Sequence, residues 1–135
     1  MPKNQKSFLN HLNKHRCKTK KTFYQQWQEN PVYCPALEKE VHATRDGWRH
    51  ISGLGKKRSI QDTHRRLDLF KYARSIVERS GTFQYVRSIN REIYYSFESV
   101  EKFLGIFEKG RKLKRIKVVI KIKKTGKAVF HSVMD

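Results

Sequence analysis

The spacing of apolar residues changes at Gly81, and this change constrains the fold more than any other feature of the sequence. From Ile60 to about Ser80, apolar side chains recur every three or four residues, which is the period of an amphipathic helix. After Gly81 the period is two, as in strands that bury one face. Helices followed by an antiparallel sheet are typical of the α+β class. We therefore expect N-terminal helices packed on a C-terminal four-stranded antiparallel β-sheet, a meander.

Capping residues and turn residues place the ends of these elements. Ser59 precedes the long helix and is followed by Asp62 three residues later, the pattern of a capping box. Thr44 stands in the same way before a short helix around Trp48. The predicted strands cover residues 82–89, 92–100, 115–123 and 128–134, and a tight turn at Asn90 and Arg91 joins the first two.

The first 33 residues differ from the rest of the chain. Their helical spacing is weak, and Pro31 and Pro35 then stop any helix. A chain of 135 residues has the length of one ordinary domain. We therefore interpret residues 1–33 as a basic helical N-terminal extension and residues 34–135 as the main α+β domain.

The net charge indicates the class of partner. The chain has 31 Lys and Arg against 12 Asp and Glu, which gives a net charge of +19. The excess is spread along the whole chain and is not confined to one tail. A domain this positive repels itself unless its surface meets a polyanion, and nucleic acid is the commonest one. An anionic membrane surface is the alternative that the same argument leaves open.

Nothing in the sequence marks the chain for a membrane or for export. No stretch approaches the ~18 apolar residues that a membrane span needs, and the basic N-terminus lacks the apolar core of a secretory signal. The two cysteines, Cys17 and Cys34, in a lysine-rich chain fit a reducing compartment. We expect a cytoplasmic protein that has no membrane partner.

His11, His15, Cys17 and Cys34 are the residues closest to a metal-ligand pattern. Their spacing departs from the paired cysteines and paired histidines of zinc sites, so we expect ordinary thiols here. The glycine patterns of nucleotide-binding loops are absent from the sequence. We expect neither a metal nor another cofactor.

Two histidines stand where metal-free RNA cleavage would use them. Such cleavage needs a base for the 2′-hydroxyl, an acid for the leaving oxygen and cations for the phosphorane. Histidine can serve as base and acid because its side chain titrates near neutral pH. His50 ends the short helix before a basic loop, and His131 lies on the last strand. Strict alternation places Phe130 and Ser132 on the core face and His131 on the open face, although a one-residue shift would exchange these roles.

Cationic and hydroxyl side chains supply the rest of the candidate site. Arg65 and Arg66 point about 100° apart on the long helix, so one can face a site while the other is solvated. A single histidine or arginine is more often an ordinary surface or core residue, and tyrosines on the sheet either stack bases or belong to the core. The candidate catalytic residues are His50, Arg58, Arg66, His131 and Ser132, and the candidate nucleic-acid-binding residues are Lys56, Lys57, Ser59, Arg65, Lys121 and Lys123.

Several short runs, taken in order, resemble a known family. The resemblance is to the phage-associated branch of the barnase–EndoU–colicin–RelE-like nucleases, and it covers residues 34–134. The runs are CPAL at 34–37, TRDGWRHI at 44–51, KRS at 57–59, RLDLF at 66–70, VI at 119–120 and FHSV at 130–133.

The resemblance implies helices packed on a four-stranded antiparallel sheet and a metal-independent RNase, often a toxin. By position it makes His50 the helical histidine and Arg66 the helix arginine. It also makes Arg58 and Ser59 the basic–Ser pair, and Ser132 the polar residue of the last strand. His131 departs from the strand pattern that the family suggests.

These observations predict a toxin-like endoribonuclease that leaves a 2′,3′-cyclic phosphate. His50 would be the general base or acid, Arg58 and Arg66 would hold the scissile phosphate, and Ser132 or His131 would complete the site. Lys121 and Lys123 would guide the backbone of RNA, with DNA left open as a substrate. An acidic immunity or antitoxin protein is a further expected partner. The alternatives are a non-catalytic basic module that binds RNA or DNA and an interaction protein that docks an acidic partner.

Overall fold

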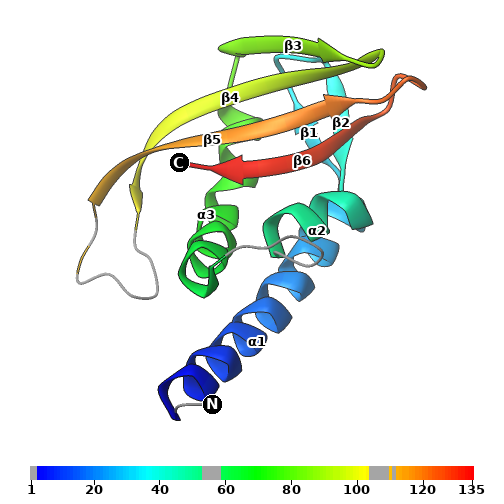
Figure 1. Ribbon diagram of the computed structural model, residues 1–135. Helices are drawn as coiled ribbons and strands as arrows, with labels where there is room; N and C mark the ends of the chain where they lie inside the picture. The colour runs from blue at the N-terminus through cyan, green and yellow to red at the C-terminus, as the bar shows by residue number, and fades with distance from the viewer. Residues whose placement is uncertain (1–2, 53–58, 104–109, 111) are drawn as a thin grey trace.

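The computed structural model describes residues 3–52, 59–103, 110 and 112–135, which form an α+β fold (Figure 1). Helix α3 begins after Ser59, whose hydroxyl accepts a hydrogen bond from the Asp62 N–H and so caps the helix as predicted. Within the described residues, no helix is both long enough and apolar enough to cross a membrane. The helices are α1 (Lys3–Phe23), which continues as the π-helical turn η1 (Tyr24–Gln28), α2 (Arg45–Ser52) and α3 (Ile60–Arg79).

The sheet has six strands, in the spatial order β1-β2-β6-β5-β4-β3. Strands β3 to β6 pair antiparallel with their neighbours, β2 runs parallel to β6, and β1 pairs antiparallel with β2. The predicted four-stranded antiparallel sheet is therefore wrong in detail, because β1 and β2 are too short to show an apolar period of two. The strands are β1 (Val32–Cys34), β2 (Lys39–His42), β3 (Tyr85–Ile89), β4 (Glu92–Phe103), β5 (Lys112–Ile122) and β6 (Ala128–Met134).

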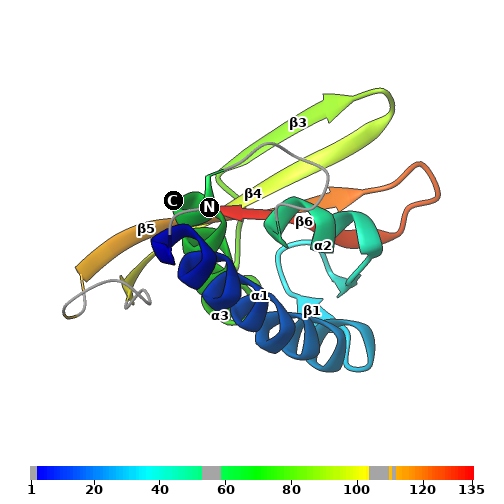
Figure 2. The same cartoon turned by 60° about the horizontal axis from the view of Figure 1, so that its bottom comes forward.

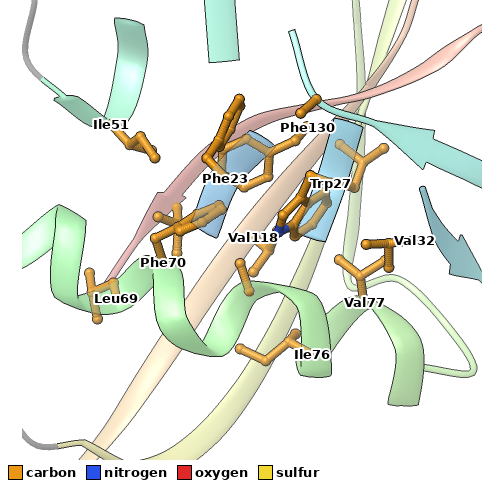
Figure 3. Close-up of a cluster of buried hydrophobic side chains, with 14 of the residues drawn as sticks. Phe23, Trp27, Val32, Ile51, Leu69, Phe70, Ile76, Val77, Val118 and Phe130 are labelled. Carbon is orange, nitrogen blue, oxygen red and sulfur yellow. The ribbon is translucent and has the colours of Figure 1, made fainter. Parts of the chain in front are cut away.

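The helices lie together on one side of the sheet, and the core fills the space between the two layers (Figures 1 and 2). Phe23 and Trp27, at the end of α1 and in η1, pack against Phe70 of α3 and Phe130 of β6 (Figure 3). Their ring centroids lie 5.0–6.0 Å apart, which is the usual range for favourable aromatic pairs. Side chains of residues 1–33 therefore belong to the same core as those of the rest of the chain.

A polar cluster joins α1 to α3 beside this apolar core. The Nδ1 atoms of His15 and His64 lie 2.7 Å apart, and the two rings are stacked. The Nε2 of His15 lies 3.1 Å from a carboxylate oxygen of Asp68, so the histidine bridges the two helices. His64 is fully buried, and Asp68 is nearly so. This polar contact ties α1 to the helix that packs on the sheet.

Acid is expected to weaken this contact. Burial lowers the pKa of His64; the neighbouring His15, His11 and Arg16 lower it further, and Asp68 opposes them. Because the folded-state pKa lies below the unfolded value of about 6.5, the unfolded chain takes up a proton first. The contribution of neutral His64 to the free energy of unfolding is therefore fully present above about pH 6.5, and it is lost as the pH falls toward the folded-state pKa of this residue.

We expect the free energy of unfolding to fall between about pH 7.5 and 5.5, and to fall less in His64→Gln. Urea denaturation of both proteins at the two pH values measures this difference. If the two proteins lose equal stability on acidification, His64 is not the responsible group.

Candidate active site on the open face of the sheet

The face of the sheet that points away from the helices carries polar and basic side chains. On β5, Ile116, Val118 and Ile120 point into the core and are fully buried. Lys117 and Val119 alternate with them and therefore point to the opposite face. The strand pairing extends this face across β4 and β3, because Ser96 pairs with Val119 and Tyr85, and Tyr94 pairs with Lys121 and Arg87. We call this side of the sheet the open face.

A pocket of about 570 Å³ is formed on the open face, and we call it the open-face pocket. It brings together four of the five candidate catalytic residues, from three elements that are distant in sequence. The fifth, Arg58, lies outside the described residues. The pocket is lined by His50, Arg66, Tyr85, Val86, Arg87, Tyr94, Ser96, Lys117, Val119, His131, Ser132 and Met134.

A β-bulge in β6 turns two neighbouring side chains into this pocket. Ser132 pairs with Val119, but the next residue of β5 pairs with Phe130, so His131 is the extra residue of the bulge. Phe130 and Val133 are both fully buried in the core, whereas His131 and Ser132 both line the pocket. The prediction that Ser132 shares the core face with Phe130 is therefore wrong. The bulge interrupts the alternation on which that prediction depended.

Helix α2 brings His50 to the bulge. Strand β2 pairs with β6 only at Ala128 and Val129. Beyond Val129, helix α2 packs against β6 in place of a neighbouring strand. There the rings of His50 and His131 lie with centroids 4.3 Å apart, and Tyr94 lies edge-on to His131 at 5.1 Å. Two imidazoles and a phenol therefore meet at one place on the open face.

Gly47 permits this close approach of α2. A Cβ atom at Gly47 would lie 2.5 Å from the carbonyl oxygen of Phe130, a backbone atom that cannot turn aside. Alanine at this position would push α2 away from β6. Because His50 is on the same helix, its ring would move away from His131.

We therefore expect Gly47→Ala to lower the free energy of unfolding by about 1–3 kcal/mol. It should also reduce any activity of the pocket by up to about 10²-fold. Gly81→Ala is the matched control, since no atom lies within 4 Å of a Cβ there and its φ is not positive. Urea denaturation and an RNA cleavage assay measure the two effects. Wild-type stability and activity in Gly47→Ala would contradict this account of the α2–β6 contact.

Arg66 reaches the same pocket from α3. Its Nη1 lies 3.5 Å from the carbonyl oxygen of Val133, and its Nε lies 3.5 Å from a carboxylate oxygen of Asp62. These two acceptors orient the guanidinium while leaving it at the pocket wall. Arg65 points elsewhere, toward Asp62 and Asp135, and does not line the pocket.

The pocket wall is basic. Arg66, Arg87 and Lys117 line the pocket together with the two histidines, and no Asp or Glu occurs among the lining residues that the structure describes. The lining residues together form a concave, positively charged surface that is partly aromatic. Such a surface suits a phosphate joined to an unstacked base.

The described candidate binding residues, Ser59, Lys121 and Lys123, do not line the pocket. Ser59 caps α3, and Lys123 closes the turn before β6, where its N–H donates to the Lys127 carbonyl. Lys121 lies on the open face beside the pocket, 6.0 Å from the Tyr94 ring centroid and 4.0 Å from a carboxylate oxygen of Glu92. Lys56 and Lys57, like Arg58, lie outside the described residues.

The pocket also contains polar residues outside the predicted set. Lys117, Arg87 and Ser96 line it but were not among the candidates. The signal for Arg87 was present, because the tight turn at Asn90 and Arg91 sets the register that places Arg87 opposite Tyr94. Lys117 could likewise have been found from its alternation with the buried residues of β5.

No group of three or more His, Cys, Asp or Glu in the described part of the chain is placed to hold a metal ion. Cys34 is buried and Cys17 is exposed, and both are free thiols. Comparison with known protein families, with curated proteins and with solved structures finds no match to this chain.

Proposed function

We propose that the chain is a metal-independent endoribonuclease whose active site is the open-face pocket. The observation that carries this proposal is the meeting of His50 and His131, with ring centroids 4.3 Å apart, beside Arg66 and Ser132 in a basic pocket. Two imidazoles and a cluster of cations are the groups that cleavage through the 2′-hydroxyl requires. The position of four candidate residues in one pocket supports this assignment.

The proposed reaction is an internal phosphoryl transfer. One imidazole takes the proton of the 2′-hydroxyl while the 2′-oxygen forms a bond to phosphorus. The bond from phosphorus to the 5′-oxygen breaks, and the other imidazole, which is protonated, donates its proton to that oxygen. The products are a 2′,3′-cyclic phosphate and a 5′-hydroxyl.

The other residues of the pocket have supporting roles in this proposal. Arg66 and Lys117 stabilise the charge that builds up on the phosphate oxygens, and the Ser132 hydroxyl donates a hydrogen bond to one of them. Tyr94 and Tyr85 offer faces on which bases stack, and Tyr85 is 65% exposed. Lys121 continues the basic surface along β5 and guides the backbone beyond the pocket.

The family resemblance belongs to the same proposal. A phage-associated nuclease of the barnase–EndoU–colicin–RelE-like type would act as a toxin on RNA in the cytoplasm. An acidic immunity or antitoxin protein would then be its natural inhibitor, since it would compete with RNA for the basic open face. The pocket chemistry does not depend on this assignment of family.

The proposal is tested with matched RNA and DNA oligonucleotides of one sequence in the presence of EDTA. We expect cleavage of the RNA and none of the DNA, because only RNA has the attacking 2′-hydroxyl. Cleavage of both, or cleavage that EDTA abolishes, would overturn the mechanism. RNA that is bound but remains intact would instead support the rival function, a non-catalytic nucleic-acid-binding module.

A further inference from the structure

The outward side of α1 carries a row of lysines. Lys14, Lys18 and Lys21 are exposed and, at about 100° per residue, lie within about 60° of one another around the helix. Leu12 and Phe23 point to the opposite side of α1 and are buried in the core. We call the three exposed residues the α1 lysine row. Helix α1 lies on the side of the sheet opposite the open face (Figure 2). Because the row is on the side of α1 away from the buried Leu12 and Phe23, it faces away from the core.

The charge of this row is not neutralised by nearby carboxylates. Residues 1–28 include no Asp or Glu. In the part of the chain that the structure describes, no ion pair involves Lys14, Lys18 or Lys21. The charges of α3, by contrast, are paired within the helix or with the sheet, as in Arg65–Asp62, Arg74–Glu78 and Arg79–Glu101.

Like charges three and four residues apart disfavour a helix. The α1 lysine row therefore carries a cost in the free protein, and a polyanion lying on the row would remove it.

We propose that the α1 lysine row is a second nucleic-acid site, which binds the phosphate backbone of an RNA duplex. The exposed residues of α1 between 10 and 21 include no Phe, Tyr or Trp on which a base could stack. A straight row of lysines on a helix instead suits the regular phosphates of a duplex. Binding at this site does not depend on cleavage in the open-face pocket, which lies on the other side of the molecule.

A membrane surface fits the row less well than a duplex does. A helix that lies on a membrane inserts an apolar face between the lipids. In α1 the apolar residues Leu12 and Phe23 are already buried in the core of the protein. Among the exposed residues of α1 between 10 and 21 there is no large apolar side chain to insert, whereas the lysines suffice for backbone phosphates.

Cys17 is a natural reporter for this site. It is exposed, lies between Lys14 and Lys18 in sequence, and is one of only two cysteines in the chain. The other, Cys34, is fully buried on β1 and so reports only unfolding. A duplex lying on the α1 lysine row would therefore cover Cys17 and leave Cys34 unchanged.

The experiment measures the rate at which a maleimide alkylates Cys17 in the full chain, with and without a saturating short RNA duplex, in EDTA. We expect the duplex to slow alkylation several-fold. In Lys14→Gln/Lys18→Gln/Lys21→Gln this protection should be lost, and the slope of log affinity against log salt should fall by up to about 2–3. Thermal melting checks the fold of this variant, which should be at least as stable as wild type because repulsion has been removed.

Lys39→Gln/Lys124→Gln/Lys127→Gln is the matched control. It removes the same charge from exposed positions on β2 and the β5–β6 turn, and it should keep the protection of Cys17. Equal alkylation rates with and without duplex would overturn the proposal, as would protection by phosphatidylserine vesicles without protection by the duplex. The same measurement is made on His50→Ala, in which the pocket should not cleave RNA. If the duplex still protects Cys17 in this variant, the α1 lysine row binds RNA independently of the proposed nuclease activity.

Discussion

Replacing His50 with alanine is expected to lower the rate of RNA cleavage by about 10²–10⁴-fold. The change removes one of the two imidazoles that meet in the open-face pocket and leaves Arg66, Lys117 and His131 in place. RNA affinity should change little, because the basic side chains of the pocket remain. Single-turnover cleavage and a filter-binding assay measure the two quantities separately.

His42→Ala is the control for this variant. His42 is a half-buried histidine on β2 that does not line the pocket. We expect the His42→Ala variant to cleave RNA at close to the wild-type rate. Equal rates for His50→Ala and wild type would remove His50 from the mechanism, and an equal loss in both variants would point to a general effect of removing histidines.

Phe130→Ala is expected to lower the free energy of unfolding by about 3–5 kcal/mol. The Phe130 ring is fully buried and contacts Phe23, Trp27 and Phe70, so its loss opens a cavity between the helices and the sheet. This is a large share of the ~5–15 kcal/mol that stabilises most domains. Chemical denaturation with urea measures the change.

Val100→Ala on β4 is the control for the core, since its side chain is 57% exposed. It should change the stability by no more than about 0.5 kcal/mol. A similar small effect in Phe130→Ala would mean that α1 and η1 do not pack on the sheet as described.

Local signals in the sequence predicted local structure well. The turn at Asn90 and Arg91 is one example, because both residues adopt the positive φ values of 51° and 68° that a two-residue hairpin turn requires. Ser59 is another, since its capping bond to the N–H of Asp62 depends only on residues three apart. The strands β3 to β6 lie where the sequence predicts them, although β3 is exposed along its whole length and β4 runs further than expected, to Phe103.

Features that depend on contacts between distant segments were not predictable in this way. β1 and β2 are three and four residues long and exist as strands because they pair with each other and with β6. The bulge at His131 likewise has no marker in the run Phe130-His131-Ser132-Val133. It is visible only in the pairing of β5 with β6, and it corrects the predicted orientation of Ser132.

The sequence predicts the types of residue in the candidate site better than it predicts their arrangement in space. His50 and His131 were chosen as residues that titrate near neutral pH, and the structure places them in ring contact. The hairpin turn and the alternation of β5 place Arg87 and Lys117 on the open face, but in the sequence a basic residue on a strand looks the same whether it lines a pocket or faces solvent. Only the register of three strands shows that these two share one wall with the histidines.

The most direct test of the central claim is the chemical nature of the ends that the protein leaves on RNA. Mass spectrometry of a short oligonucleotide, incubated with wild-type protein in EDTA and sampled early, determines both ends at once. The account predicts a 2′,3′-cyclic phosphate on one fragment and a 5′-hydroxyl on the other, because the attacking group is the 2′-oxygen. A 5′-phosphate, which marks attack by water, or an uncut oligonucleotide would contradict it.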